Sequence, residues 1–202
     1  NRPWPIMNQI KFQRAVDWQC RQHGAPWHCP PRGHKGGNKF KDVKTFAVVR
    51  NPYDRMVSEY YYYFNKHPKK IHRNIRTGVS EPINDLNDRE FMNQWISDAV
   101  YVATKHGHCY SGHCVKFSKY LYNAKDGTRT VSHVLKMENL TEEFDALMDL
   151  YHLPIRMEQH NIRKGTSTLG VEDLSRETIT EINEWARQDF DLFGYEMLDP
   201  GM

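Results

Sequence analysis

The sequence lacks a long apolar run, a linker and a repeat. None of its hydrophobic segments approaches the roughly 18 consecutive apolar residues that a membrane-spanning helix needs, so no membrane segment is predicted. No Gly/Ser-rich stretch divides the 202 residues, and no internal repeat or low-complexity tract is present. We therefore expect a single domain over 1–202, because a chain of this length with 39% hydrophobic residues can bury one sizeable core.

A strong charge and a leader are also missing. The formal net charge is only +3, which suits an anionic ligand but falls short of a dedicated nucleic-acid binder, so no nucleic-acid partner is expected. The opening Asn-Arg-Pro-Trp-Pro is not a signal peptide, and no initiator methionine precedes it. We expect an N-terminally truncated piece of a longer precursor, whose cellular address lies upstream.

Cysteine is scarce, and the four residues fall into two local pairs, Cys20 with Cys29 and Cys109 with Cys114. An even count at short separations is typical of disulfides in a secretory compartment. The second pair lies in the histidine-rich segment 106–114, so free thiols and a zinc site are alternatives. The disulfide is favoured, because the spacing is not a standard zinc pattern and both cysteines lie in one small loop.

A strand-to-helix junction has the pattern of an anion site. The β-branched and aromatic run 46–49 is too short for a helix and predicts a buried strand of a parallel sheet. Arg50 stands at its carboxyl end, where open α/β sheets bind ligands. Asn51 suits a helix cap, Pro52 suits the first helical position, and Asp54 is a first-turn carboxylate. A helix is therefore predicted to start at this place.

Arg55 and Ser58 lie three residues apart on that helix and share a face. Together with Arg50 they bring guanidinium and hydroxyl donors to one spot, which suits a phosphate group. An ordinary capped junction with surface ion pairs is the alternative interpretation.

The run Val-Arg-Asn-Pro-Tyr-Asp-Arg-Met-Val-Ser over 49–58 resembles the 3′-phosphate-binding motif of sulfotransferases that use 3′-phosphoadenosine 5′-phosphosulfate (PAPS). The resemblance implies that Arg50 and Ser58 hold the 3′-phosphate, with Arg55 nearby. It implies PAPS as donor, adenosine 3′,5′-bisphosphate (PAP) as product, and no required metal. It also implies a three-layer α/β fold with a mostly parallel sheet flanked by helices, similar to the P-loop kinases.

Hydrophobic periodicity and caps predict the remaining elements. Helices are expected over 8–23, 88–104, 141–151 and 175–193, and a strand over 130–137. The basic stretch 67–87 is expected to be a solvated loop, and a rim that receives an acidic polysaccharide is its functional alternative. Strand, polar junction and helix recur at 130–151, as βα units require.

Three further features are similar to sulfotransferases, the first to the family in general and the other two to its polysaccharide-modifying branch. They are the Glu138-Asn139-Leu140 junction, the Cys109 to Cys114 loop and the closing Asp189 to Tyr195 segment. The resemblance implies a carbohydrate acceptor, supports the disulfide, and places the protein in the Golgi lumen or secretory pathway, with the cytoplasm as alternative. Asn139-Leu140-Thr141 also matches a glycosylation sequon.

His28 is the preferred general base, because histidine accepts protons near neutral pH. Polysaccharide 2-O-sulfotransferases place a catalytic histidine in the comparable interval, whereas a structural hydrogen bond is the alternative role for His28. His34 is the next candidate. Arg163, Lys164 and Gly165 resemble a loop of cytosolic sulfotransferases that closes over the 3′-phosphate, against the alternative of an ordinary basic loop.

The family's Pro-Lys-Thr-Gly-Gly-Thr-like loop, which wraps the 5′-phosphosulfate, is missing. The segment 33–37 has Gly, His and Lys but neither the preceding strand nor the following helix, so Lys35 is a weak substitute. We expect this phosphate-loop unit to lie upstream of Asn1, and a defective homologue is the alternative. The predicted function is PAPS-dependent sulfuryl transfer to a hydroxyl, on a carbohydrate acceptor. Alternatives are a noncatalytic binding module for acidic glycans or nucleic acid, and a zinc-stabilised interaction protein built on 106–114.

Overall fold

The computed structural model describes residues 43–66, 71–107, 109, 113–123, 126–158 and 168–201. Its strands are β1 (Phe46–Val49), β2 (Ile71–Arg73), β3 (Ser80–Pro82) and β4 (His133–Lys136). Its α-helices are α3 (Pro52–Lys66), α4 (Arg89–His106), α5 (Phe117–Leu121), α6 (Leu140–Leu150) and α7 (Arg176–Phe193), with short 3₁₀ turns at Met137–Asn139 and Val171–Asp173. The helix predicted over 8–23 lies outside the described residues.

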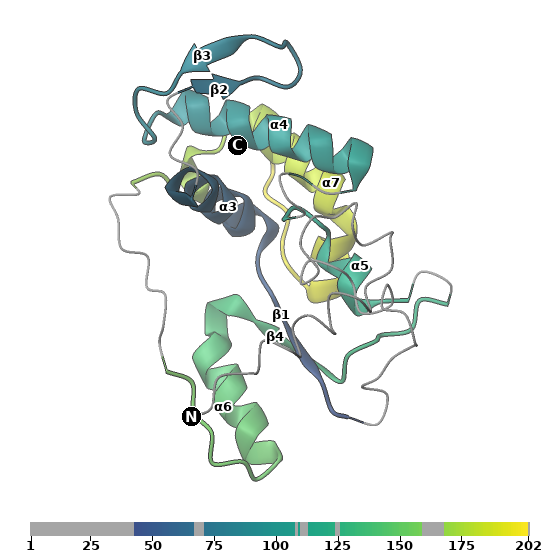
Figure 1. Ribbon diagram of the computed structural model, residues 1–202. Coiled ribbons are helices and arrows are strands. Elements are labelled where there is room, and N and C mark those ends of the chain that lie inside the picture. Colours follow the sequence, from purple (N-terminus) through teal and green to yellow (C-terminus); the bar gives the residue numbers. More distant parts are fainter. Residues whose placement is uncertain are drawn as a thin grey trace, which may run out of the picture.

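Strands β1 and β4 pair in parallel, with Phe46 opposite His133 and Val49 opposite Lys136 (Figure 1). Helices cover both faces of this pair. Val48 and Leu135 pack against α6, whereas Val49 packs against α5 and the end of α7. The predicted α/β class, a parallel sheet flanked by helices, is confirmed.

The largest core lies between α3, α4 and α7, which pack together beside the strands (Figure 1). Fully buried aromatic and aliphatic side chains fill it, among them Tyr60, Trp95 and Ile182. Tyr60 makes edge contacts with the Trp95 ring at 5.6 Å between centroids, the geometry that aromatic pairs prefer. Tyr60 and Tyr61, two of the four consecutive tyrosines at 60–63, are therefore part of the core rather than a ligand-binding surface.

Three predicted helix boundaries are confirmed by their caps. The carboxylate of Asp88 accepts hydrogen bonds from the backbone N–H groups of Glu90 and Phe91 at the start of α4. The Ser175 hydroxyl accepts from the N–H of Thr178 at the start of α7. Gly194 ends α7 with a φ of 63°, a left-handed conformation that glycine adopts without strain.

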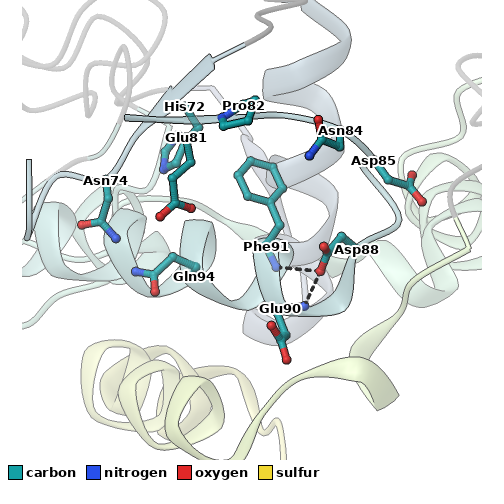
Figure 2. Close-up of a pocket in the computed structure, with 10 residues that line it drawn as sticks. All are labelled: His72, Asn74, Glu81, Pro82, Asn84, Asp85, Asp88, Glu90, Phe91 and Gln94. Atoms are coloured by element: carbon teal, nitrogen blue, oxygen red, sulfur yellow. Dashed lines mark hydrogen bonds between the residues drawn. The ribbon is translucent and has the colours of Figure 1, made fainter. Parts of the chain in front are cut away.

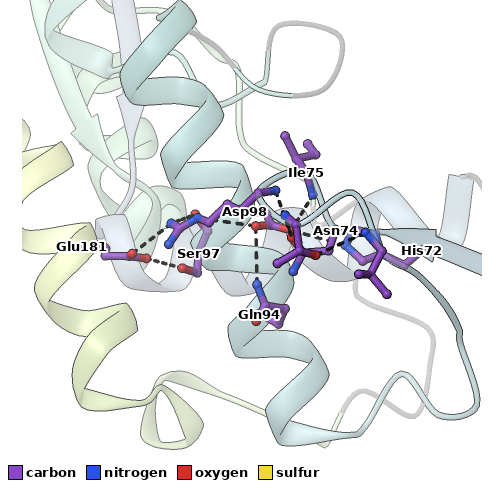
Figure 3. Close-up of polar contacts among 10 residues, drawn as sticks. His72, Asn74, Ile75, Gln94, Ser97, Asp98 and Glu181 are labelled. Atoms are coloured by element: carbon purple, nitrogen blue, oxygen red, sulfur yellow. Dashed lines mark hydrogen bonds and ion pairs between the residues drawn. The ribbon is translucent and has the colours of Figure 1, made fainter.

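The stretch expected to be a basic loop contains the β2–β3 hairpin, so that expectation is wrong for 71–73 and 80–82. Strands of three residues leave no detectable alternation in a sequence. The hairpin is held by α4 instead, because the fully buried Asp98 accepts from the N–H of Ile75 and lies 3.6 Å from both His72 Nε2 and Arg76 Nε (Figure 3). Contacts distant in sequence thus define this element.

Helix α5 depends on a side chain from another element. Both carboxylate oxygens of the buried Asp189, on α7, accept backbone hydrogen bonds at the start of α5, from Phe117 and Ser118 at 2.8 and 2.9 Å. A helix of five residues is too short to be stable alone. This remote cap explains why periodicity gave no sign of α5.

Cys109 and Cys114 form a disulfide with a Cα–Cα separation of 4.9 Å, which confirms the favoured pairing. Cys20 and Cys29 lie outside the described residues. No helix within the described ranges is long and apolar enough to cross a membrane.

Candidate functional site

The carboxyl ends of β1 and β4 lie at the same edge of the parallel pair, because Val49 and Lys136 are in register. Arg50 follows β1 and Glu138 follows β4, so two polar junctions meet there. Each junction leads directly into a helix, α3 and α6 respectively. This edge is where ligands of open α/β sheets bind.

The start of α3 follows the predicted cap geometry. The side-chain oxygen of Asn51 accepts from the N–H of Tyr53 at 3.0 Å, and its carbonyl accepts from the N–H of Arg55 at 2.9 Å. Pro52 occupies the first helical position and Asp54 lies in the first turn. Helix α3 therefore begins at Pro52, two residues after Arg50. The positive end of its dipole lies at the edge of the sheet.

Glu138 connects the two junctions, a role that the sequence indicates only by a polar residue after a strand. One carboxylate oxygen accepts from the Asn51 N–H at 2.7 Å, and the other accepts from the Tyr195 hydroxyl at 2.8 Å. Tyr195 follows α7, so Glu138 ties β1, β4 and the end of α7 together. Nearby, Lys136 Nζ lies 4.6 Å from the centre of the Tyr195 ring.

The electrostatics of this carboxyl group reflect its partners. Burial acts to raise the pKa of Glu138, but the hydrogen bonds from Asn51, from its own backbone and from Tyr195, together with the positive charge of Arg50, hold that pKa below its usual value. Burial and the same carboxylate raise the pKa of Tyr195. Glu138 is therefore ionised, and Tyr195 is a neutral donor, at neutral pH.

Arg50 and Ser58 are both partly exposed. Arg50 acts on Glu138 through its charge. Among the described residues, no hydrogen bond joins the Ser58 hydroxyl to another group. Both side chains thus have polar donors that a phosphate at this edge could use.

Arg55 is used differently from Arg50. Its Nη2 donates to the backbone carbonyls of His113 and Val115 at 2.8 and 2.7 Å, and its guanidinium carbon lies 4.1 Å from the centre of the Phe117 ring. Burial lowers the pKa of Arg55, although the Asp189 carboxylate acts in the opposite direction. The side chain fastens the disulfide loop to α3, and binding of the cofactor by Arg55 stays a prediction.

The same loop is attached to α3 by an acidic residue. Nδ1 of His113 lies 2.8 Å from a carboxylate oxygen of Glu59, and the His113 ring packs on Tyr62 with 5.1 Å between ring centres. Glu59 and His113 border a pocket of about 390 Å³ beside β1, together with Phe117. Sequence reasoning missed this pair, because 54 residues separate its members.

The remaining predicted site residues lie outside the described part of the chain. They are His28, His34, Lys35, Arg163, Lys164 and Gly165. Their roles stay predictions. Asn139, the first residue of the sequon, lies exposed directly before α6.

A pocket of about 420 Å³ between the β2–β3 hairpin and α4 is unsuited to a nucleotide. Its walls include Glu81, Asp85, Asp88 and Glu90, and Figure 2 shows these acidic side chains around Phe91. A ligand with several negative charges would be repelled by these four carboxylates. The edge formed by β1 and β4 is the better candidate for an anionic donor.

Within the described ranges, no group of three or more His, Cys, Asp or Glu side chains is arranged to hold a metal ion. The sulfur atoms of Cys109 and Cys114 are joined to each other. They are therefore not thiolates, which zinc would require.

Comparison with known proteins gives one match. The family model described as the sulfotransferase family matches residues 11–196. The chain therefore belongs to the sulfotransferase family, a class of transferases. Neither the curated proteins nor the solved structures include a match.

Proposed function

We propose that this sulfotransferase moves a sulfuryl group from PAPS to a hydroxyl of a carbohydrate. The observation that carries the proposal is Arg50 at the carboxyl end of β1, followed at once by the capped start of α3. The family match over 11–196 supports sulfuryl transfer and a single domain over 1–202. PAPS as donor and carbohydrate as acceptor are the finer parts of the proposal.

The nucleotide half of the donor binds at this edge. Arg50 supplies a charged donor and Ser58 a hydroxyl for the 3′-phosphate, and the amino end of α3 adds its positive dipole. Glu138 holds the Asn51 backbone at 2.7 Å, so the turn that carries Arg50 is fixed before the ligand arrives. Such preorganisation lowers the entropic cost of binding.

Transfer itself consists of one in-line displacement. A bond forms between the acceptor oxygen and sulfur, the bond from sulfur to the 5′-phosphate oxygen breaks, and PAP leaves with the electron pair. The acceptor hydroxyl loses its proton to a general base, which we assign to His28. Arg163, Lys164 and Gly165 are proposed to close over the 3′-phosphate, and no metal is needed in this scheme.

The Cys109–Cys114 disulfide supports a Golgi or secretory location, because such bonds persist in oxidising compartments. A cytoplasmic location is the alternative. The branch of polysaccharide 2-O-sulfotransferases is the proposed placement within the family.

The proposal is tested by calorimetric titration of the chain with PAP. We expect Arg50→Ala to weaken PAP binding by at least tenfold, since a charge-assisted hydrogen bond contributes about 1.5–3 kcal/mol. Ser58→Ala should weaken it by about fivefold. Arg187→Ala, on the exposed side of α7, is the matched control. Equal PAP affinity in Arg50→Ala and Arg187→Ala would refute the assignment of this edge.

A noncatalytic module for acidic glycans is the second candidate, favoured by Lys116 and Lys119, which line one pocket. The two are separated by incubating the protein with PAPS and a mixture of glycan acceptors. Release of PAP that depends on acceptor and is lost in His28→Ala supports the enzyme. Glycan binding without any turnover favours the module.

A further inference from the structure

A second pocket has the opposite charge character to the acidic one. It has a volume of about 330 Å³ and lies between the carboxyl-terminal half of α4, the start of α5 and the middle of α7. Its charged and polar walls are formed by Arg76, Tyr101, Thr104, Lys116, Lys119, Glu181 and Glu184. Three cations therefore face two carboxylates, and one cation is paired with one of these carboxylates.

Arg76 engages that carboxylate. Its Nη2 donates to Glu181 Oε1 at 2.9 Å and to the carbonyl of Ser97 at 2.8 Å, and its Nε lies 3.6 Å from Asp98 (Figure 3). The guanidinium carbon lies 5.1 Å from the centre of the Tyr101 ring. Arg76 thus contacts Tyr101, and its pairing with Glu181 neutralises one cation and one carboxylate. Lys116 and Lys119 then face a single carboxylate, that of Glu184.

Tyr101 presents a flat, partly apolar surface. The residue is 40% exposed, and Lys105 Nζ lies 5.8 Å from its ring centre. An exposed aromatic ring fixed by a cation is a suitable platform for the C–H face of a ring-shaped ligand, and Thr104 adds a hydroxyl beside it. The Tyr101 ring and the pocket's lysines together suit a ligand that has both an apolar and an anionic part.

The two lysines of α5 provide the anion-binding side. Lys116 is the residue before α5, and Lys119 lies on its last turn. A Cβ atom added to Gly107 would lie 2.9 Å from Lys119 Nζ, so this ammonium lies at the carboxyl-terminal cap of α4. The negative end of the α4 dipole favours a cation there. Lys119 therefore lies at the end of α4 and lines the same pocket as Tyr101.

We propose that this pocket binds an acidic sugar unit of the glycan acceptor, through its carboxylate or sulfate at Lys116 and Lys119 and its ring on Tyr101. The proposal rests on the proposed function, because it assigns part of the acceptor of that reaction. The position fits a subsite separate from the proposed nucleotide site. Trp185, at the pocket, and Gly194, beside the Glu138 junction, are separated by roughly 14 Å along α7.

The test uses two oligosaccharides of equal length in calorimetric titrations, a hyaluronan hexasaccharide with carboxylates and chitohexaose without charge. We expect the hyaluronan hexasaccharide to bind, chitohexaose to bind at least tenfold more weakly, and raised salt to remove the difference. Lys116→Gln and Lys119→Gln should each weaken hyaluronan binding by about fivefold. Lys44→Gln, an exposed lysine near β1, is the control.

A variant of opposite sign keeps the test independent of folding. Glu184→Gln removes the carboxylate that opposes an anion, so it should strengthen hyaluronan binding by about threefold. Equal binding of both oligosaccharides, or an unchanged affinity in all three pocket variants, would overturn the proposal. Inorganic sulfate that competes as well as the hexasaccharide does would overturn the sugar part.

PAP titrations on the same variants separate this proposal from the proposed function. Unchanged PAP affinity in Lys116→Gln and Lys119→Gln is expected, because the nucleotide binds at Arg50. A loss of PAP affinity in these variants would assign the pocket to the donor and overturn the acceptor subsite. A failure of Arg50→Ala to change PAP affinity counts against the proposed function instead.

Discussion

The backbone N–H of Asn51 donates to Oε1 of Glu138 at 2.7 Å, across 87 residues of sequence. The bond joins the turn after β1 to the turn after β4. Because Oε2 of the same carboxylate accepts from Tyr195, the end of α7 is held by the same group. A single acidic side chain therefore fixes the edge of the sheet where Arg50 lies.

Replacement of Glu138 tests that connection. Glu138→Ala leaves the Asn51 N–H and the Tyr195 hydroxyl without this acceptor, so we expect a loss of about 1 kcal/mol in the free energy of unfolding. Glu138→Gln keeps one acceptor oxygen and should lose less. Urea denaturation measures both variants, and equal stability of Glu138→Ala and the native chain would contradict the role.

The contribution of the Glu138 charge should depend on pH. Its pKa in the folded state is below the ordinary value of 4.5, so the unfolded chain binds the proton first as the pH falls. The stabilisation is therefore complete above pH 4.5 and is lost as the pH falls through the lower folded pKa. The difference in unfolding free energy between the native chain and Glu138→Gln should shrink across this acidic range. If this difference instead grows as the pH falls, the predicted direction of the pKa shift is wrong.

Two roles of Arg55, attachment of the disulfide loop and binding of the cofactor, can be distinguished with one variant. If it fastens the disulfide loop, Arg55→Ala leaves the carbonyls of His113 and Val115 without their donor and should lower the free energy of unfolding by roughly 2–4 kcal/mol. PAP affinity, measured below the melting temperature, should change by less than about threefold. A large loss of PAP affinity at unchanged stability would instead place Arg55 in the cofactor site.

Replacement of Asp189 should lower the free energy of unfolding by about as much as replacement of Arg55. Asp189→Ala removes the cap of α5 and a negative charge near the half-buried Arg55, and we expect a loss of about 3 kcal/mol. Asp189→Asn retains one acceptor oxygen and should lose less. Asp191→Ala, an exposed position on the same helix, is the control for thermal denaturation. Similar melting temperatures in Asp189→Ala and Asp191→Ala would show that the cap is dispensable.

Local signals in the sequence predicted the elements that carry their own start and stop residues. The junction at Asn51 and Pro52 and the ends of α7 at Ser175 and Gly194 belong to this group, because caps act within a few residues. The same is true of the Arg50 position. A strand end is recognisable from the apolar run that precedes it.

Elements that depend on distant partners could not be predicted in this way. Helix α5 needs Asp189, the β2–β3 hairpin needs Asp98, and the role of Glu138 appears only when β1 and β4 pair. In each case the two members are separated by at least 23 residues. A periodicity of two or 3.6 residues contains no information about such contacts.

Helix α7 connects the two proposed binding regions through a single rigid element. Glu184 and Trp185 lie at the cationic pocket, while Tyr195, just beyond the helix, contacts the Glu138 junction. Because the helix is rigid, the separation between the two proposed binding regions is constant. Under the two proposals, the acidic sugar unit and the bound nucleotide are held at a constant separation, so that sulfation falls at a fixed position relative to that acidic unit.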